Sequence, residues 1–139
     1  MKYRIYLDDE RTPIDKNWII VRDYYQFVET VMKIGLPNID IISLDHDLGD
    51  SAIGEYYRSG RHNREIDYSR ITEKTGYDCA KWLTDLALDK KEDLPLVYTH
   101  SKNPSGCQNI IGIINSFLRF NDLDETCTIA SIPHTVNYN

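Results

Sequence analysis

The chain has 139 residues, of which 41% are hydrophobic and 27% are charged, and its formal net charge is −6. This length and composition are typical of one globular domain that buries a core without disulfides, so we expect a single domain over residues 1–139. They exclude an intrinsically disordered chain, and the acidic balance argues against binding to duplex nucleic acid, which needs a basic face.

The N-terminal third of the sequence predicts two strands and a helix. Residues 3–7 have the apolar and aromatic content of a strand, and residues 18–21 form a second, shorter strand. The connection between them, residues 11–17, contains Pro13 and polar side chains and is predicted to be a loop. It is too short for the usual crossover helix. Residues 24–34 place apolar side chains at helical spacing.

The middle of the chain predicts a buried strand, a long loop and a helix. Residues 39–44 are nearly all apolar, as expected of a strand covered on both faces. Residues 49–74 show no clear apolar period and are crowded with charge and tyrosine, so we expect a long charged loop insertion. Either a lid that stacks a base or a solvated loop of mixed charge fits this composition. Thr75 and Asp78 resemble the capping box of a following helix.

The last third of the sequence predicts two more strands around one helix. Residues 94–98 form the fourth strand and residues 126–132 the fifth. Between them, Asn103 followed by Pro104 marks a sharp helix start. No convincing helix follows the fifth strand. The alternation of strands and helices predicts a three-layer α/β fold around a mostly parallel sheet.

Polar residues follow several of the predicted strands, and parallel strands bring their carboxyl ends to one edge of a sheet. Asp8 and Asp9 follow the first strand, and Asp45-His46-Asp47 follows the third. His100-Ser101 follows the fourth strand, and His134 follows the fifth. The sequence therefore predicts one site built from segments that are far apart along the chain.

Carboxylates gathered at that edge repel one another unless a cation neutralises them or protons remain bound. We expect Asp8, Asp9, Asp45 and Asp47 to hold a divalent metal, Mg²⁺ in the first place and Mn²⁺ as the alternative, because hard cations take oxygen ligands. Asp47 has a second interpretation, which is to orient His46. The simpler alternative for all four is that they cap loops on a solvated edge.

His46, His100 and Asp45 are the candidate catalytic residues. A neutral imidazole can take or give a proton near pH 7, so the two histidines are expected to act as general base and general acid, in an order that the sequence does not assign. The alternative is that each histidine is a structural hydrogen-bonding residue.

Arg11, Ser101, Lys102 and Asn103 are the candidate substrate-binding residues. Arg11 can hold a phosphate with two parallel hydrogen bonds, and the helix that starts at Asn103 presents free N–H groups to an anion. The alternatives are a salt bridge from Arg11 to Glu10 or Asp15, and simple helix capping by Asn103. We expect a small phosphate or nucleotide as ligand.

The motifs resemble the receiver superfamily and, within it, the cyclic-phosphate processing receiver-like domains. The resemblance covers nearly the whole chain apart from the long charged segment and the last few residues. It is carried by Leu7-Asp8-Asp9-Glu10-Arg11-Thr12-Pro13, Trp18, Val21-Arg22, Ser43-Leu44-Asp45-His46-Asp47-Leu48-Gly49, Thr75-Gly76-Tyr77-Asp78, Trp82-Leu83 and His100-Ser101-Lys102-Asn103-Pro104.

The resemblance implies a receiver-like (flavodoxin-like) fold with five strands in the order 2-1-3-4-5, here with the first and last helices degenerate or missing. It implies that Asp8 and Asp9 bind metal, that Asp45 occupies the phosphoacceptor position, and that Thr99 or Ser101 supplies a switch hydroxyl. Two features depart from an ordinary receiver. Ile132 stands before Pro133 where receivers carry a lysine, and His46 and His100 are not receiver signatures.

These features together favour a metal-dependent phosphoesterase that hydrolyses a cyclic phosphate or cyclic-nucleotide-type substrate. The family's settings suggest nucleotide-signalled phage defence or counter-defence. A non-catalytic module that binds a nucleotide or docks on a partner protein is the alternative, and a degenerate phosphoacceptor is a third hypothesis.

The cysteines and the hydropathy of the sequence indicate the cellular compartment of the protein. The three cysteines are widely spaced and form no CxxC motif, so we expect reduced thiols and no cysteine-based metal site. No stretch approaches the roughly 18 apolar residues of a membrane span, and the first residues lack the features of a signal peptide. We therefore expect a cytoplasmic protein, monomeric or homodimeric, without a membrane partner.

Overall fold

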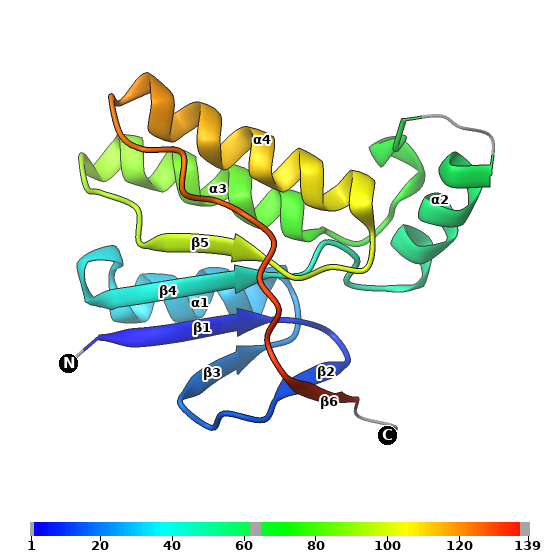
Figure 1. Ribbon diagram of the computed structural model, residues 1–139, viewed down its shortest axis with the longest axis horizontal. Coiled ribbons are helices and arrows are strands. Elements are labelled where there is room, and N and C mark those ends of the chain that lie inside the picture. Colours follow the sequence, from blue (N-terminus) through cyan, green and yellow to red (C-terminus); the bar gives the residue numbers. More distant parts are fainter. Residues whose placement is uncertain (1, 62–64, 137–139) are drawn as a thin grey trace.

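The fold is that of a computed structural model, which describes residues 2–61 and 65–136. Four parallel strands form the central sheet in the order β3-β1-β4-β5, which is the predicted order of the first four strands (Figure 1). Their bounds are Tyr3–Leu7 for β1, Trp18–Val21 for β3, Ile39–Leu44 for β4 and Leu96–Thr99 for β5. The protein is therefore an α/β protein with a receiver-like sheet, as predicted.

The helices lie between and beside these strands. Their bounds are Tyr24–Ile34 for α1, Asp50–Arg61 for α2, Gly76–Lys90 for α3 and Pro104–Phe120 for α4, with short 3₁₀ helices at Leu36–Asn38 and Tyr68–Arg70. Phe27, Val31 and Leu83 of α1 and α3 pack with Ile5 and Leu44 of the sheet in one apolar core. None of the described helices combines the length and the hydropathy that a membrane crossing requires.

The predicted helix starts are confirmed by their capping bonds. The Thr75 hydroxyl accepts the Asp78 N–H, and the Asp78 carboxylate accepts the Thr75 N–H, which completes the capping box of α3. The Asn103 side chain accepts the Gly106 N–H at the start of α4. In the described part of the chain no helix connects β1 to β3 and none follows residue 121, so the first and last receiver helices are missing, as expected.

The predicted fifth strand is reduced to a single contact. Thr99 donates its N–H to the carbonyl of Thr128 and accepts the N–H of Ala130, which gives one isolated parallel bridge. Both backbone groups of Cys127 are taken by the Asn115 side chain of α4 instead of by β5. The sequence prediction of a strand over residues 126–132 was wrong in extent, because these backbone groups bind elsewhere.

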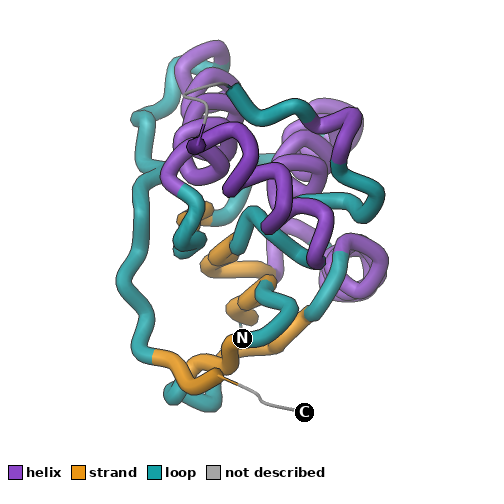
Figure 2. Tube along the Cα trace, turned by 90° about the vertical axis from the view of Figure 1, so that its right-hand side faces the viewer, coloured by secondary structure: helices purple, strands orange, loops and turns teal. Residues whose placement is uncertain are grey.

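The C-terminal segment ends in a strand that the sequence did not predict. After passing β5, the chain runs in front of the sheet in Figure 1 to reach β6, His134–Val136. This strand pairs antiparallel with β2, Arg11–Pro13, which lies inside the segment predicted as a loop. Figure 2 shows this segment on one side of the strands, with α1 and α3 on the opposite side. His134, which was expected at the edge formed by the strand ends, is exposed and lies opposite Pro13 in the β2–β6 pair.

The long charged loop predicted for residues 49–74 was also wrong, because this segment contains α2 and a 3₁₀ turn. Residues 62–64 of it lie outside the described residues. Ala52, Glu55 and Ser59 are the buried positions of α2, at a spacing of three and four residues. A buried stripe with a glutamate and a serine has no apolar period, and so the helix was not visible in the hydrophobic pattern.

The start of α3 lies very close to the segment that follows β4. The Gly76 N–H donates to the carbonyl of His46 at 2.9 Å, and a Cβ atom at Gly76 would lie 1.7 Å from the carbonyl oxygen of Asp45. Only a glycine allows this approach, which fixes where the Asp45 backbone lies.

We expect Gly76→Ala to lower the free energy of unfolding by about 1–3 kcal/mol or more, because the methyl group must displace the Asp45 backbone. Gly112→Ala is the matched control, since a Cβ atom there meets nothing within 4 Å inside α4 and is expected to add about 0.5–1 kcal/mol. Urea denaturation measures both. Equal stability of wild type and Gly76→Ala would contradict the close approach.

Candidate functional site

The strand ends of the sheet are level with one another. Leu7 lies opposite Val21 on one side and Leu44 on the other, and Leu44 lies opposite Thr99. The next residue of each strand continues the ladder: Asp45 donates its N–H to Leu7, and His100 donates its N–H to Leu44. Register alone therefore places residues 8, 45 and 100 side by side, as the sequence predicted.

Three carboxylates meet at this edge. Asp8, Asp9 and Asp45 each offer one oxygen atom, and these oxygens lie within 4.8 Å of one another. Asp8 and Asp45 are buried, at 1% and 5% exposure, and Asp9 is half-buried. Oxygen donors at this spacing fit a hard divalent cation such as Mg²⁺. The sequence prediction for these three residues agrees with the geometry, and their metal binding stays a prediction.

The protonation of these acids reflects their burial and their closeness to one another. Burial and the neighbouring Asp8 raise the pKa of Asp45 to about 8, and the same causes raise the pKa of Asp9 to about 6. Burial opposes the ionisation of Asp8, but hydrogen bonds from His100 and from the N–H groups of Arg11 and Glu10 outweigh it and lower the pKa of Asp8. At neutral pH the cluster therefore carries less negative charge than three ionised carboxylates would.

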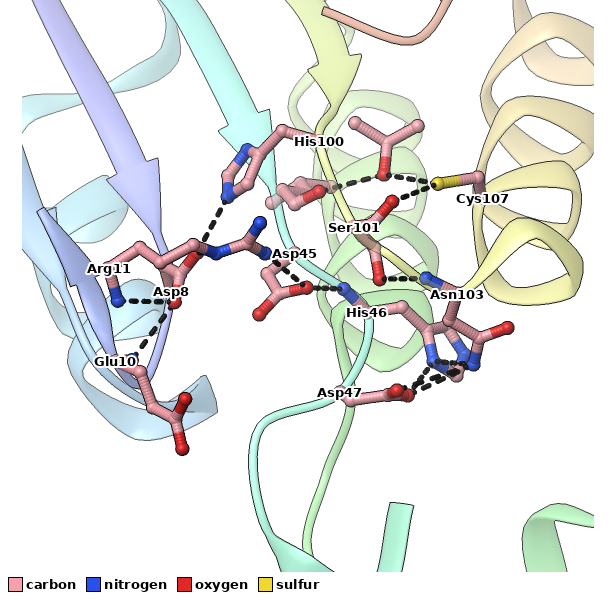
Figure 3. Close-up of polar contacts among 12 residues, drawn as sticks. Asp8, Glu10, Arg11, Asp45, His46, Asp47, His100, Ser101, Asn103 and Cys107 are labelled. Atoms are coloured by element: carbon pink, nitrogen blue, oxygen red, sulfur yellow. Dashed lines mark hydrogen bonds and ion pairs between the residues drawn. The ribbon is translucent and has the colours of Figure 1, made fainter. Parts of the chain in front are cut away.

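Arg11 bridges two of the acids (Figure 3). Its Nε atom lies 2.7 Å from Asp8 Oδ2, and its Nη2 atom lies 3.3 Å from Asp45 Oδ1. The ion pair expected as an alternative, with Glu10 or Asp15, is therefore replaced by pairs across the sheet edge. Arg22 supports this loop, because its guanidinium donates to the carbonyl oxygens of Asp8 and Arg11.

His100 is held on both sides. Its Nε2 atom lies 3.1 Å from Asp8 Oδ2, its Nδ1 atom lies 2.7 Å from the Ser43 hydroxyl, and its ring stacks on Tyr6 at a centroid distance of 4.2 Å. Burial lowers the pKa of His100, although its hydrogen bond to Asp8 opposes the shift. Burial thus favours the neutral imidazole, and the ring holds the Asp8 carboxylate through Nε2.

His46 is buried completely, at 0% exposure. Its Nδ1 atom lies 2.6 Å from Asp47 Oδ1, and its Nε2 atom lies 2.9 Å from the Tyr68 hydroxyl. Asn103 donates from Nδ2 to Asp47 at 3.1 Å, beside the His46 ring (Figure 3). Asp47 is not part of the metal-type group found among the described residues, and so the geometry supports its second expected role, which is to pair with His46.

A cavity of about 380 Å³ opens onto these groups. Ser101 and Lys102 line it, and their contact with a substrate stays a prediction, whereas the Thr99 hydroxyl donates to the buried carbonyl of Leu44. Of the two hydroxyls that the resemblance offered, only Ser101 faces the cavity. The full lining is Asp8, Asp9, Glu10, Arg11, Asp45, Asp47, Ile53, Tyr56, Tyr57, Ser101, Lys102 and Asn103.

Sequence reasoning assigned no site role to several supporting residues. Arg22, Ser43 and Tyr6 hold Arg11 and His100 in place, and Tyr68 closes the bond network of His46. Arg22 directly follows β3, so the rule that polar residues after strands share one edge could have found it. Tyr68 is one of the tyrosines of the charged segment for which base stacking was considered, but no signal in the sequence indicates its contact with His46.

Comparison with known proteins places this site in a family. A family model described as "Cyclic-phosphate processing Receiver domain" matches residues 3–116, and the chain belongs to that family. The match includes the acids of the cavity lining and both His46 and His100, and it confirms the resemblance predicted from the motifs. Neither a curated protein nor a solved structure matched the chain.

The raised pKa of Asp45 gives a test of the metal site. At pH 7 most Asp45 carboxyls carry a proton, and a cation binds only the ionised form, so Mg²⁺ binding is expected to release about one proton per ion. The affinity for Mg²⁺ should rise with pH and level off above about pH 8. Calorimetry in two buffers of different ionisation enthalpy measures the release.

Asp45→Asn should abolish this release, and Asp40→Asn, at an exposed position of β4, should preserve it. Magnesium binding with a heat that is independent of the buffer would show that Asp45 is not protonated in the metal-free protein.

Proposed function

We propose that this protein hydrolyses a cyclic phosphate ester with the help of a divalent cation. The observation that carries the proposal is the meeting of Asp8, Asp9 and Asp45 within 4.8 Å at a cavity that Arg11 also lines. The family's description supports the substrate class, which is a cyclic phosphate. Hydrolysis and metal dependence rest on the chemistry of these side chains.

The reaction consumes only water. The water oxygen bonds to phosphorus, one P–O bond of the ring breaks, and the proton lost by the water ends on the ring oxygen that leaves, which becomes a hydroxyl group. When bound by the three carboxylates, the cation supplies positive charge that stabilises the phosphoryl oxygens.

The phosphate is expected to contact the cations and donors of the cavity. Arg11 already lies between Asp8 and Asp45 and presents a planar set of N–H donors, which suits two oxygens of one phosphate. Lys102 and Ser101, which follow β5, line the same cavity. Asn103 is fully engaged by Gly106 and Asp47, and so it acts by holding the start of α4 and the Asp47 carboxylate.

The two histidines act through carboxylates in this proposal. Neither ring belongs to the cavity lining, and both nitrogen atoms of each ring have partners. Asp47 does line the cavity and is paired with the Nδ1 atom of His46. This pair therefore takes the proton of the water and returns it to the ring oxygen that leaves. His100 positions the Asp8 carboxylate, and Asp45 is a ligand of the cation in this proposal.

A ring-opening assay tests the proposed function. Glycerol 1,2-cyclic phosphate and 2′,3′-cyclic AMP are incubated with the protein and Mg²⁺ or Mn²⁺, and ³¹P NMR follows the cyclic phosphorus signal. We expect ring opening that stops with EDTA. Asp45→Asn and Asp8→Asn should each lose about a hundredfold or more in rate, because the charge that balances the phosphoryl group is lost.

Asp40→Asn is the control, since this carboxylate is exposed on β4 and lies outside the cavity lining. Ring opening that persists in EDTA and in Asp45→Asn would refute the metal-dependent mechanism. Tight binding with the intact cyclic phosphate recovered would instead identify a sequestering module.

A further inference from the structure

We propose that the substrate is a cyclic mononucleotide, whose base stacks on Tyr56 and Tyr57 of α2. This inference rests on the proposed function for the phosphate end of the ligand and extends it to the other end. It follows from the lining and volume of the cavity, from the hydrogen bonds that hold α2 in place and from the charge of the lining residues.

The cavity has two chemically different walls. The carboxylates, Arg11 and Lys102 line the side formed by the strand ends. Ile53, Tyr56 and Tyr57, which we call the α2 wall, line the other side. These three residues are spaced by three and four positions and therefore share one face of the helix. Figure 1 shows α2 standing beyond the carboxyl ends of β4 and β5, opposite the sheet.

The α2 wall is held in place by partly buried polar contacts. At the start of the helix, Glu73 accepts the Ala52 N–H at 2.8 Å and the Ser51 hydroxyl. Further along, Glu55 is only 3% exposed and accepts the Asp67 N–H together with hydrogen bonds from Arg58. These bonds join α2 to residues 67 and 73, so the tyrosines face the cavity from a fixed helix.

The α2 wall offers a free aromatic surface. Tyr57 is 69% exposed, and its ring centroid lies 5.5 Å from that of Tyr56 at an interplanar angle of 43°. A cavity of about 380 Å³ is larger than one phosphate group needs and lies in the range of small-molecule sites. Its occupant therefore has an anionic end and an apolar, flat end, which describes a nucleotide.

The charge of the lining limits the number of phosphate groups. Arg11 and Lys102 are its only cationic side chains among the described residues, against five acids, and two of those acids already pair with Arg11. One bound divalent cation and these two side chains suit a single phosphate. A nucleoside triphosphate would add more negative charge than this site can balance, which favours a mononucleotide.

A pair of substrates isolates the contribution of the base. We expect Tyr57→Ala to raise KM for 2′,3′-cyclic AMP about tenfold or more and to leave KM for glycerol 1,2-cyclic phosphate unchanged, because the latter has no base. Tyr57→Phe keeps an aromatic ring and should retain the wild-type KM. Tyr25→Ala is the matched control, since Tyr25 is 68% exposed on α1 and lies outside this cavity lining.

A fluorescence titration tests stacking without turnover. The 2′,3′-cyclic phosphate of 2-aminopurine riboside is added to the Asp45→Asn protein, and stacking is expected to quench its fluorescence. The quenching should be lost when Tyr56→Ala and Tyr57→Ala are introduced together and should persist with Tyr25→Ala. Thermal melting of each variant reports whether the fold is retained.

Equal rises in KM for both substrates in Tyr57→Ala, or no rise for either, would refute the stacking proposal. Quenching that survives the loss of both tyrosines would refute it as well. If neither cyclic phosphate is opened but the tyrosine-dependent quenching occurs, then the hydrolytic function fails while the nucleotide subsite stands.

Discussion

Asp8 and Asp45 are two buried acids placed next to each other, and this arrangement is unfavourable unless positive charge or protons accompany it. Arg11 supplies part of that charge by contacting both carboxylates. Burial and the neighbouring Asp8 still raise the pKa of Asp45 to about 8, so protons supply the remainder. His100 and two backbone N–H groups favour the ionised form of Asp8. The site is thus a buried acidic cluster that is only partly neutralised, an arrangement that a divalent cation would stabilise.

The fold maintains this cluster through short, closely packed connections. The strand ends are level because the parallel ladder continues one residue beyond β4 and β5, at Asp45 and His100. Gly76 lets the start of α3 approach the Asp45 carbonyl, and a Cβ atom at Gly106 would lie 2.4 Å from the His46 ring. The two glycines therefore let two helix starts pack directly against the segment that carries Asp45 and His46.

The second layer of polar contacts extends away from the cluster toward α2. His46 connects Asp47, at the cavity, to the Tyr68 hydroxyl, and Tyr68 is also bound by Asn109 of α4. Burial raises the pKa of Tyr68 to about 12, so this hydroxyl stays neutral. The segment that carries Tyr68 is joined to α2 through Glu55. Asp47, His46 and the α2 wall thus belong to one connected set of hydrogen bonds.

Local patterns in the sequence determined the elements with an apolar period and a marked start: β1, β3, β4, β5 and the helices α1, α3 and α4. The same patterns located Asp8, Asp9, Asp45 and His100, because residues that follow parallel strands must meet at one edge. Only the tertiary structure showed α2, since its buried face carries Glu55 and Ser59, and only it showed that Arg11 pairs with Asp45. Pairing between side chains far apart in the chain depends on three-dimensional packing, and a periodicity of three or four residues does not record it.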